Sequence, residues 1–258
     1  MDVTIELIIT AYLIFLRVTG LVVVAPFFSL MAIPRTVKIF LSIICTLLLY
    51  NVIPSSGVEG ITGLDGVNLI FISIKELLVG VAIGFVAKII FAGLEMAGSL
   101  ISLQTALSFA NMVDANTQNQ SSILGTLFGL LGVLLFLVID GEKMLLNSLA
   151  QSYDVVPIGQ ASIASVGPYF LEIATYLFII GVQLTTPFII VIFLIDVSLA
   201  IFARIMPQAN LMFIALPIKF GVGILILMVM LPYFPSVFTT IFNHISDFIQ
   251  GTIGILRP

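Results

Sequence analysis

Few residues in this chain could carry acid–base, metal or nucleophilic chemistry. His244 is the only histidine, Cys45 is the only cysteine, and the 13 aspartates and glutamates are scattered along 258 residues. A catalytic site needs an acid, a base or a metal-ligating set brought together, and neither metal-ligand spacing nor a phosphate-binding glycine loop appears. The sequence therefore predicts neither an enzyme nor a bound cofactor or metal.

Several charges lie inside apolar stretches, namely Arg17, Lys75, Glu76, Lys88, Glu95, Asp196 and Lys219. A charge at a bilayer centre costs about 2.5–3.5 kcal/mol or more, so each is expected to face protein or water. We expect Arg17, Asp196 and Arg204 to be buried structural partners, with Arg17 paired to Asp196. The backbone carbonyls that proline frees need partners from neighbouring helices, and the prolines inside or beside apolar runs are Pro26, Pro34, Pro187, Pro217, Pro232 and Pro235. These features predict helices packed mostly against protein, as part of an assembly.

A narrow stripe of small residues lies beside one of these carboxylates. Glu76, Gly80 and Gly84 repeat at four-residue spacing, which places them on one face of a helix. Such stripes let another backbone approach closely, either from a partner or from the same chain. Lys88 and Glu95 are seven residues apart and share a face, but they are too distant along the helix for direct contact.

The composition indicates which elements must position these residues. Hydrophobic residues make up 60% of the chain and charged residues 9%, with a mean hydropathy of +1.29. A soluble domain carries about 25% charged residues, so most of this exterior must face lipid or other protein. The net charge of −4 is too small to indicate nucleic acid as a partner. The prediction is an all-α integral membrane protein without β-sheet.

Six apolar stretches follow one another, at residues 7–33, 37–53, 67–113, 123–150, 168–203 and 211–256. A simple span needs about 20 apolar residues, which makes residues 123–139 a plausible span. As a helix, the stretch 67–113 would be about 70 Å long. It must therefore break, with Gly93 and Gly98 as candidate points, or extend well beyond the bilayer.

Polar or glycine- and proline-rich segments at residues 54–66, 114–122 and 151–168 are predicted to connect these stretches. The segment 236–250 is amphipathic, with an apolar face of Phe238, Ile241, Phe242, Ile245, Phe248 and Ile249 and a polar face of Thr240, Asn243, His244 and Asp247. His244 is thus expected to be a solvated surface residue, and Cys45 a small buried hydrophobe. The positive-inside rule, applied to Arg35 and Lys38, places residues 34–38 in the cytoplasm and both the N-terminus and the 54–66 loop outside.

An ordered series of motifs resembles the FliR family over nearly the whole chain. The series comprises Arg17-x-x-Gly20, Ala25-Pro26-Phe27, Ile33-Pro34-x-x-x-Lys38, Glu76-x-x-x-Gly80-x-x-x-Gly84, Ala97-Gly98, Gln104-x-x-Leu107-Ser108-Phe109-Ala110, Val113-Asp114, Pro157-Ile158-Gly159, Pro187, Asp196, Arg204-x-x-Pro207-Gln208-x-Asn210 and Pro217-x-Lys219. The chain departs from the family in two places. Ala106 stands where the family often has Gly, and Ala115 where it often has Pro.

The resemblance implies a subunit of the flagellar type III protein-export gate in the bacterial inner membrane, at the flagellar basal body. It implies FliP-, FliQ- and FlhB-type partners, unfolded flagellar proteins as substrates, and tilted helical hairpins with residues 1–167 similar to FliP and 168–258 similar to FliQ. The residues expected to be buried polar or assembly positions are Arg17, Glu76, Gly80, Gly84, Lys88, Glu95, Asp196, Arg204, Pro207, Gln208 and Lys219. The alternatives are a stand-alone transporter or ion channel, or the equivalent subunit of a virulence-type secretion system.

In the family, the segment that matches residues 104–120 forms a plug inside the closed pore. Here its predicted plug or gating residues are Gln104, Leu107, Phe109, Met112, Val113, Asn116 and Gln118. Bulky apolar groups can close a constriction to water and ions, and methionine is flexible enough to reseal around varied substrates. Without the resemblance, the same segment reads as an exposed loop between helices.

Overall fold

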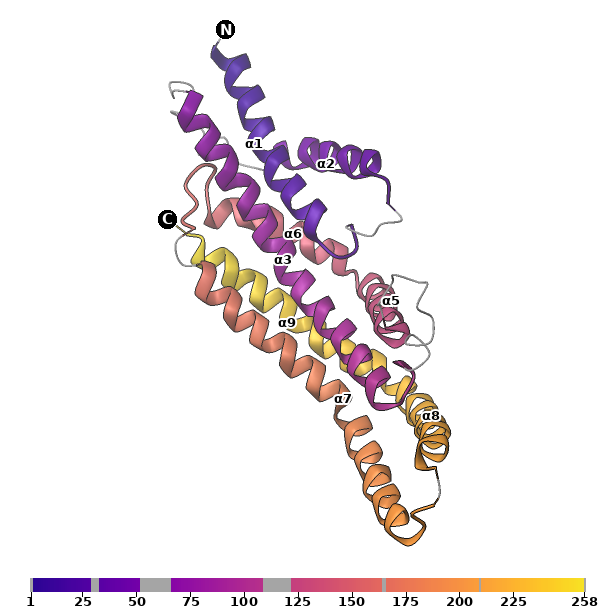
Figure 1. Ribbon diagram of the computed structural model, residues 1–258. Coiled ribbons are helices and arrows are strands. Elements are labelled where there is room, and N and C mark those ends of the chain that lie inside the picture. Colours follow the sequence, from indigo (N-terminus) through magenta and orange to yellow (C-terminus); the bar gives the residue numbers. More distant parts are fainter. Residues whose placement is uncertain are drawn as a thin grey trace. The chain divides into compact units, whose positions relative to one another are not determined.

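The computed structural model describes residues 2–28, 33–51, 66–108, 122–163, 166–208 and 210–257, and the regular elements within these ranges are all helical. In chain order they are α1 (Asp2–Val24), α2 (Arg35–Tyr50), α3 (Gly66–Gln104), α5 (Ile123–Val138), α6 (Gly141–Val155), α7 (Val166–Ile205), α8 (Leu211–Met230), the 3₁₀ turn η3 (Leu231–Tyr233) and α9 (Phe234–Ile255) (Figure 1). The predicted all-α class is confirmed.

In the described part of the chain, four helical segments are long and apolar enough to cross a membrane. They are Glu6–Val24, Gly66–Gln104, Val166–Ile205 and Phe213–Ile255, and α5 with α6 makes a fifth if that bent pair is one span. The two helices of the pair meet at 70°. Asp140 lies at this bend with a φ of 57°, a left-handed conformation that ends the helical path of α5. The bend therefore falls at the end of the predicted span 123–139, inside the longer apolar stretch 123–150.

The sequence left two alternatives for the stretch 67–113, a break at Gly93 or Gly98 or an extension well beyond the bilayer. The structure excludes the break, because α3 runs through both glycines without interruption. Its 39 residues make a helix of about 58 Å, longer than a hydrocarbon core of about 30 Å. A Cβ on Gly98 would overlap the carbonyl oxygen of Leu124, and one on Gly93 would lie 3.2 Å from that of Leu177. The two glycines thus let α5 and α7 approach α3 closely, and tertiary packing outweighs their weak tendency to end a helix.

The last apolar stretch, 211–256, is divided by η3, which contains Pro232. The amphipathic face predicted for residues 236–250 is confirmed in α9. Its apolar side chains are buried, apart from a half-buried Phe248, and its predicted polar face is exposed. Cys45 is also buried, as predicted.

The chain divides into two compact units that are described separately. Unit 1 comprises Met1–Ile89, Phe136–Ala174 and Phe242–Pro258, and unit 2 comprises Ile90–Leu135 and Thr175–Ile241. Within unit 1 the rings of Phe136 and Phe242 meet edge to face, and within unit 2 those of Phe128 and Phe234 do the same. Both units draw residues from either side of position 167. The division into FliP-like and FliQ-like parts at that position stays a prediction.

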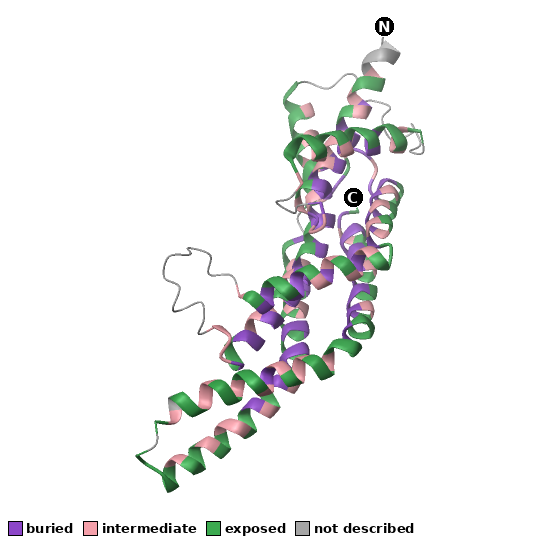
Figure 2. Ribbon diagram, turned by 90° about the vertical axis from the view of Figure 1, so that its right-hand side faces the viewer, coloured by how far each residue is buried: buried purple, intermediate pink, exposed green. Residues whose placement is uncertain are grey.

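Burial differs strongly among the candidate spans. Within the most apolar 18 residues of each span, 67% of the residues are buried in α3. The corresponding shares are 11% in α7 and 6% in the span formed by α8 and α9. Around the connection between α7 and α8 the ribbons are almost wholly exposed or half-exposed (Figure 2). Much of this apolar surface therefore lacks cover from the described part of the chain.

Candidate functional site

A buried ion pair in unit 1 joins α1 to α3. Arg17 and Glu76 are both fully buried, and the guanidinium Nε donates to Glu76 Oε2 at 2.6 Å. A second bond runs from Arg17 Nη2 to Glu76 Oε1 at 3.1 Å, so the contact is bidentate. Planar two-point pairing of this kind is the strong form of a charge-assisted hydrogen bond.

Further partners extend the pair to α6 and to the irregular segment that follows it. Arg17 Nη1 donates to Ser152 Oγ and Nη2 donates to the carbonyl of Val156, each at 3.1 Å. The guanidinium carbon lies 4.1 Å from the centre of the Tyr153 ring, a cation–π arrangement. Arg17 therefore connects three parts of the chain that lie far apart in sequence.

Glu76 fixes the turn after α6 from the other side. Its Oε1 accepts a hydrogen bond of 2.8 Å from the backbone N–H of Gly159, a residue with a φ of 83°. Glycine is suited to that conformation because it has no Cβ. Sequence reasoning placed this turn in a connector and found Gly159 only as part of the Pro157-Ile158-Gly159 motif. The contributions of Ser152, Tyr153 and Val156 were missed, since nothing in their local spacing marks them.

The expected pairing of Arg17 with Asp196 is wrong. Glu76 occupies the carboxylate position on Arg17, and Asp196 pairs instead with Lys219, whose Nζ lies 2.6 Å from Asp196 Oδ1. This second pair joins α7 to α8 in unit 2 and is partly exposed, with side-chain exposures of 46% for Asp196 and 22% for Lys219. Both pairs join helices that are neighbours in space, a relation that spacing within one helix does not encode.

The stripe of Gly80 and Gly84 packs against α1 of the same chain. A Cβ on Gly80 would overlap the carbonyl oxygen of Arg17, and one on Gly84 would lie 3.0 Å from that of Leu21. From the other side, a Cβ on Gly20 would lie 2.5 Å from the carbonyl oxygen of Leu77. Of the two alternatives left open by the sequence, the structure shows close packing within the chain. This close approach brings the backbones of α1 and α3 together around the Arg17–Glu76 pair.

Within the described part of the chain, the remaining predicted site residues make no hydrogen bond or ion pair with one another. Lys88, Glu95, Gln104, Arg204, Pro207 and Gln208 are exposed, and Leu107 is half-buried. Phe109, Met112, Val113, Asn116 and Gln118 lie outside the described residues, as do the predicted connector 54–66, except for its last residue, and most of the connector 114–122. Their gating and assembly roles stay predictions.

Comparison with known proteins decides the identity of this helical chain. The family model described as bacterial export proteins, family 1, matches residues 8–245. The flagellar biosynthetic protein FliR of Pectobacterium carotovorum is 31% identical over 93% of this chain and 90% of the relative. The chain belongs to the FliR family.

Two further relatives carry the same name. FliR of Aquifex aeolicus is 29% identical over 95% of this chain and 93% of the relative, and FliR of Bacillus subtilis is 27% identical over 99% of each. As a FliR-family member, the chain is a subunit of the flagellar export apparatus in the bacterial inner membrane. It is a transport component rather than an enzyme, and its context is the flagellar export apparatus.

Proposed function

We propose that this chain forms part of the wall of the export pore, and that residues 104–120 close that pore when no substrate is passing. Unfolded flagellar proteins cross through the pore, which is a passive conduit driven by partner proteins and the membrane gradient. The family match over residues 8–245 carries this proposal. The gating role of the central segment is the part that goes beyond the family assignment.

The place where the central segment leaves α3 supports a plug. The helix ends at Gln104, and Ala106 has a φ of 61°, a left-handed conformation that turns the chain away from the helix axis. The chain returns at Ile123, the first residue of the strongly apolar α5. A segment between two apolar helices that combines several polar amide groups with Phe109 and Met112 can close a constriction and still yield to a passing chain.

Uncovered surfaces support assembly with FliP-, FliQ- and FlhB-type subunits. Large apolar side chains are exposed along α7 and α8, among them Phe193 at 63% and Phe213 at 77%. Lys88 is exposed in the interior of α3, where a charge facing hydrocarbon would cost about 2.5–3.5 kcal/mol or more. Contact with other subunits would cover the apolar residues and supply polar partners for such charges.

Deleting residues 106–120 from the full-length chain tests the plug. In cells that assemble the whole apparatus, we expect the deletion to raise leakage of small ions across the inner membrane. The control is a chain in which the same number of residues is replaced by a flexible Gly/Ser segment, because both variants should leak if specific side chains make the seal. Unchanged leakage from a fully assembled apparatus would refute the plug.

Purification tests the partners. The chain should co-purify with FliP- and FliQ-type subunits and should be unstable alone in detergent. A well-behaved single chain that transports a small solute in liposomes would contradict the proposed function.

A further inference from the structure

Glu95 is exposed at a point where α3 is otherwise covered. From Ile90 to Ser102, Glu95 is the one exposed residue of α3, and all the remaining residues are buried or half-buried. Its carboxylate has no hydrogen bond or ion pair with any described residue, whereas Glu76 of the same helix and Asp196 of α7 each have a cationic partner. Unit 2 therefore exposes a carboxylate that no described residue neutralises.

The carboxylate lies against two glycines on one face of α5, Gly125 and Gly129, which together are called the glycine track. A Cβ added to Gly129 would lie 3.0 Å from Glu95 Cγ and 3.0 Å from Oε1, and one added to Gly125 would lie 3.1 Å from the carbonyl oxygen of Glu95. On one side of this track Leu124 and Phe128 are buried. The exposed carboxylate must therefore be accessible from the other side of α5.

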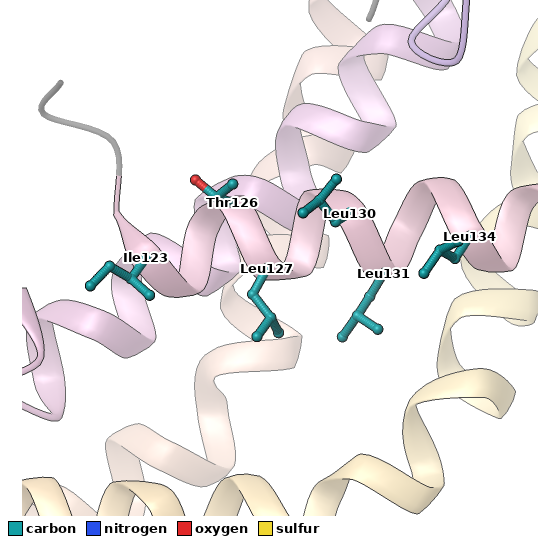
Figure 3. Close-up of a pocket in the computed structure, with 6 residues that line it drawn as sticks. All are labelled: Ile123, Thr126, Leu127, Leu130, Leu131 and Leu134. Carbon is teal, nitrogen blue, oxygen red and sulfur yellow. The ribbon is translucent and has the colours of Figure 1, made fainter. Parts of the chain in front are cut away.

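That other side of α5 carries an apolar groove. Its lining residues are Ile123, Thr126, Leu127, Leu130, Leu131 and Leu134, drawn as sticks in Figure 3. Thr126 and Leu130 each follow a track glycine by one residue, which places them about 100° further round the helix, next to the carboxylate. Leu130 and Leu134 are 55% and 59% exposed. The groove thus offers a strip of leucine side chains on the same helix that contacts the Glu95 carboxylate at Gly129.

We propose that Glu95 and this groove bind one membrane helix of a neighbouring subunit of the apparatus, and that this helix carries a Lys or Arg among apolar residues. The inference rests on the proposed function, since it names the chemistry of a partner in that assembly. A helix fits because backbone polar groups in a membrane must be satisfied internally. A basic residue fits because a carboxylate facing hydrocarbon is costly until an opposite charge compensates it.

Charge variants of the full-length chain, expressed with the other apparatus subunits, test the site. Glu95→Lys should lower the recovery of the neighbouring subunit with the purified chain by at least about tenfold, because it opposes two like charges. Glu95→Gln keeps the size of the side chain and should lower recovery less. Glu172→Lys is the matched control, since Glu172 is also an exposed carboxylate in an apolar helix but belongs to α7 and does not line the groove, and it should leave recovery unchanged.

Photo-cross-linking from benzoylphenylalanine placed at Leu130 or Leu134 identifies the occupant. The expected adduct is a membrane helix that contains a basic residue, and changing that residue to Glu should restore assembly of Glu95→Lys. Adducts only with lipid, with a water-soluble protein or with a second copy of this chain would overturn the proposal. If Glu95→Lys fails to accumulate in the membrane, Glu95→Gln and the cross-links decide the question.

The two proposals fail in distinguishable ways. If the wild-type chain recovers no membrane subunit, the proposed function is wrong. If the wild-type chain recovers its partners and Glu95→Lys recovers them equally well, only the docking site is wrong.

Discussion

Removing the carboxylate of Glu76 is expected to destabilise the chain strongly. Glu76→Ala leaves a fully buried guanidinium without its counter-charge and breaks both Arg17–Glu76 hydrogen bonds. It also removes the acceptor for the N–H of Gly159. Breaking one side of a buried pair costs about 3–5 kcal/mol, and we expect the loss in free energy of unfolding to fall in that range.

The double variant separates the ion pair from the hydrogen bonds around it. Arg17→Met alone should also cost about 3–5 kcal/mol, because it strands the Glu76 carboxylate, and Glu76→Met alone should cost about as much as Glu76→Ala. Together, Arg17→Met and Glu76→Met remove both charges and leave the carbonyl of Val156 and the N–H of Gly159 without these partners, at about 1–3 kcal/mol each. At mid-range, the double variant should thus be about 4 kcal/mol more stable than the sum of the two single Met losses predicts, and that difference is the coupling energy.

Reversible unfolding of the full-length chain in mixed micelles, followed by circular dichroism, measures these free energies. The steady-state amount of each variant in membranes gives a second readout. Single variants within about 1 kcal/mol of the wild type would show that water or lipid headgroups reach the pair. Losses that simply add, to within about 0.5 kcal/mol, would show that the two residues do not act as a pair.

Three further substitutions test separate features. Gly80→Ala should destabilise the chain by about 3 kcal/mol, measured by the same unfolding assay, because the new methyl group overlaps the backbone of Arg17; a change below about 0.5 kcal/mol would contradict this packing. Ala106→Gly should stabilise it by about 0.5 kcal/mol, because a left-handed alanine costs about 1–2 kcal/mol and the greater unfolded freedom of glycine offsets part of that; glycine at a helical alanine, as control, should destabilise. Asp196→Lys should reduce assembly of the apparatus, judged by co-purification, and Lys219→Asp in the same chain should restore it, unless the pair contributes nothing to holding α7 against α8.

Local patterns predicted the class of the protein and several of its surfaces. A high apolar fraction with scattered charges indicates membrane helices whatever their arrangement, and the all-helical structure follows. The 3.6-residue period in residues 236–250 predicted the buried face of α9, because that period depends only on neighbours within one helix. The Gly80 and Gly84 stripe was likewise found from spacing alone, although its partner helix was left open.

Contacts between helices could not be predicted in this way. The choice of Glu76 rather than Asp196 as the partner of Arg17 depends on the register and crossing of α1 and α3, which are set by packing over residues 59 positions apart. The uninterrupted course of α3 depends on the same kind of contact, since α5 and α7 cover Gly93 and Gly98 and hold the helix together.

The sequence by itself therefore determined that the chain is a helical membrane protein with charges that need partners, because composition and period are local properties. Only the tertiary structure decided which charge meets which, and that Glu95 is left exposed beside an apolar groove on α5. The physical reason is that a charge in an apolar helix needs a polar or oppositely charged partner, which the sequence shows. Which residue is that partner depends on the helix that packs against it.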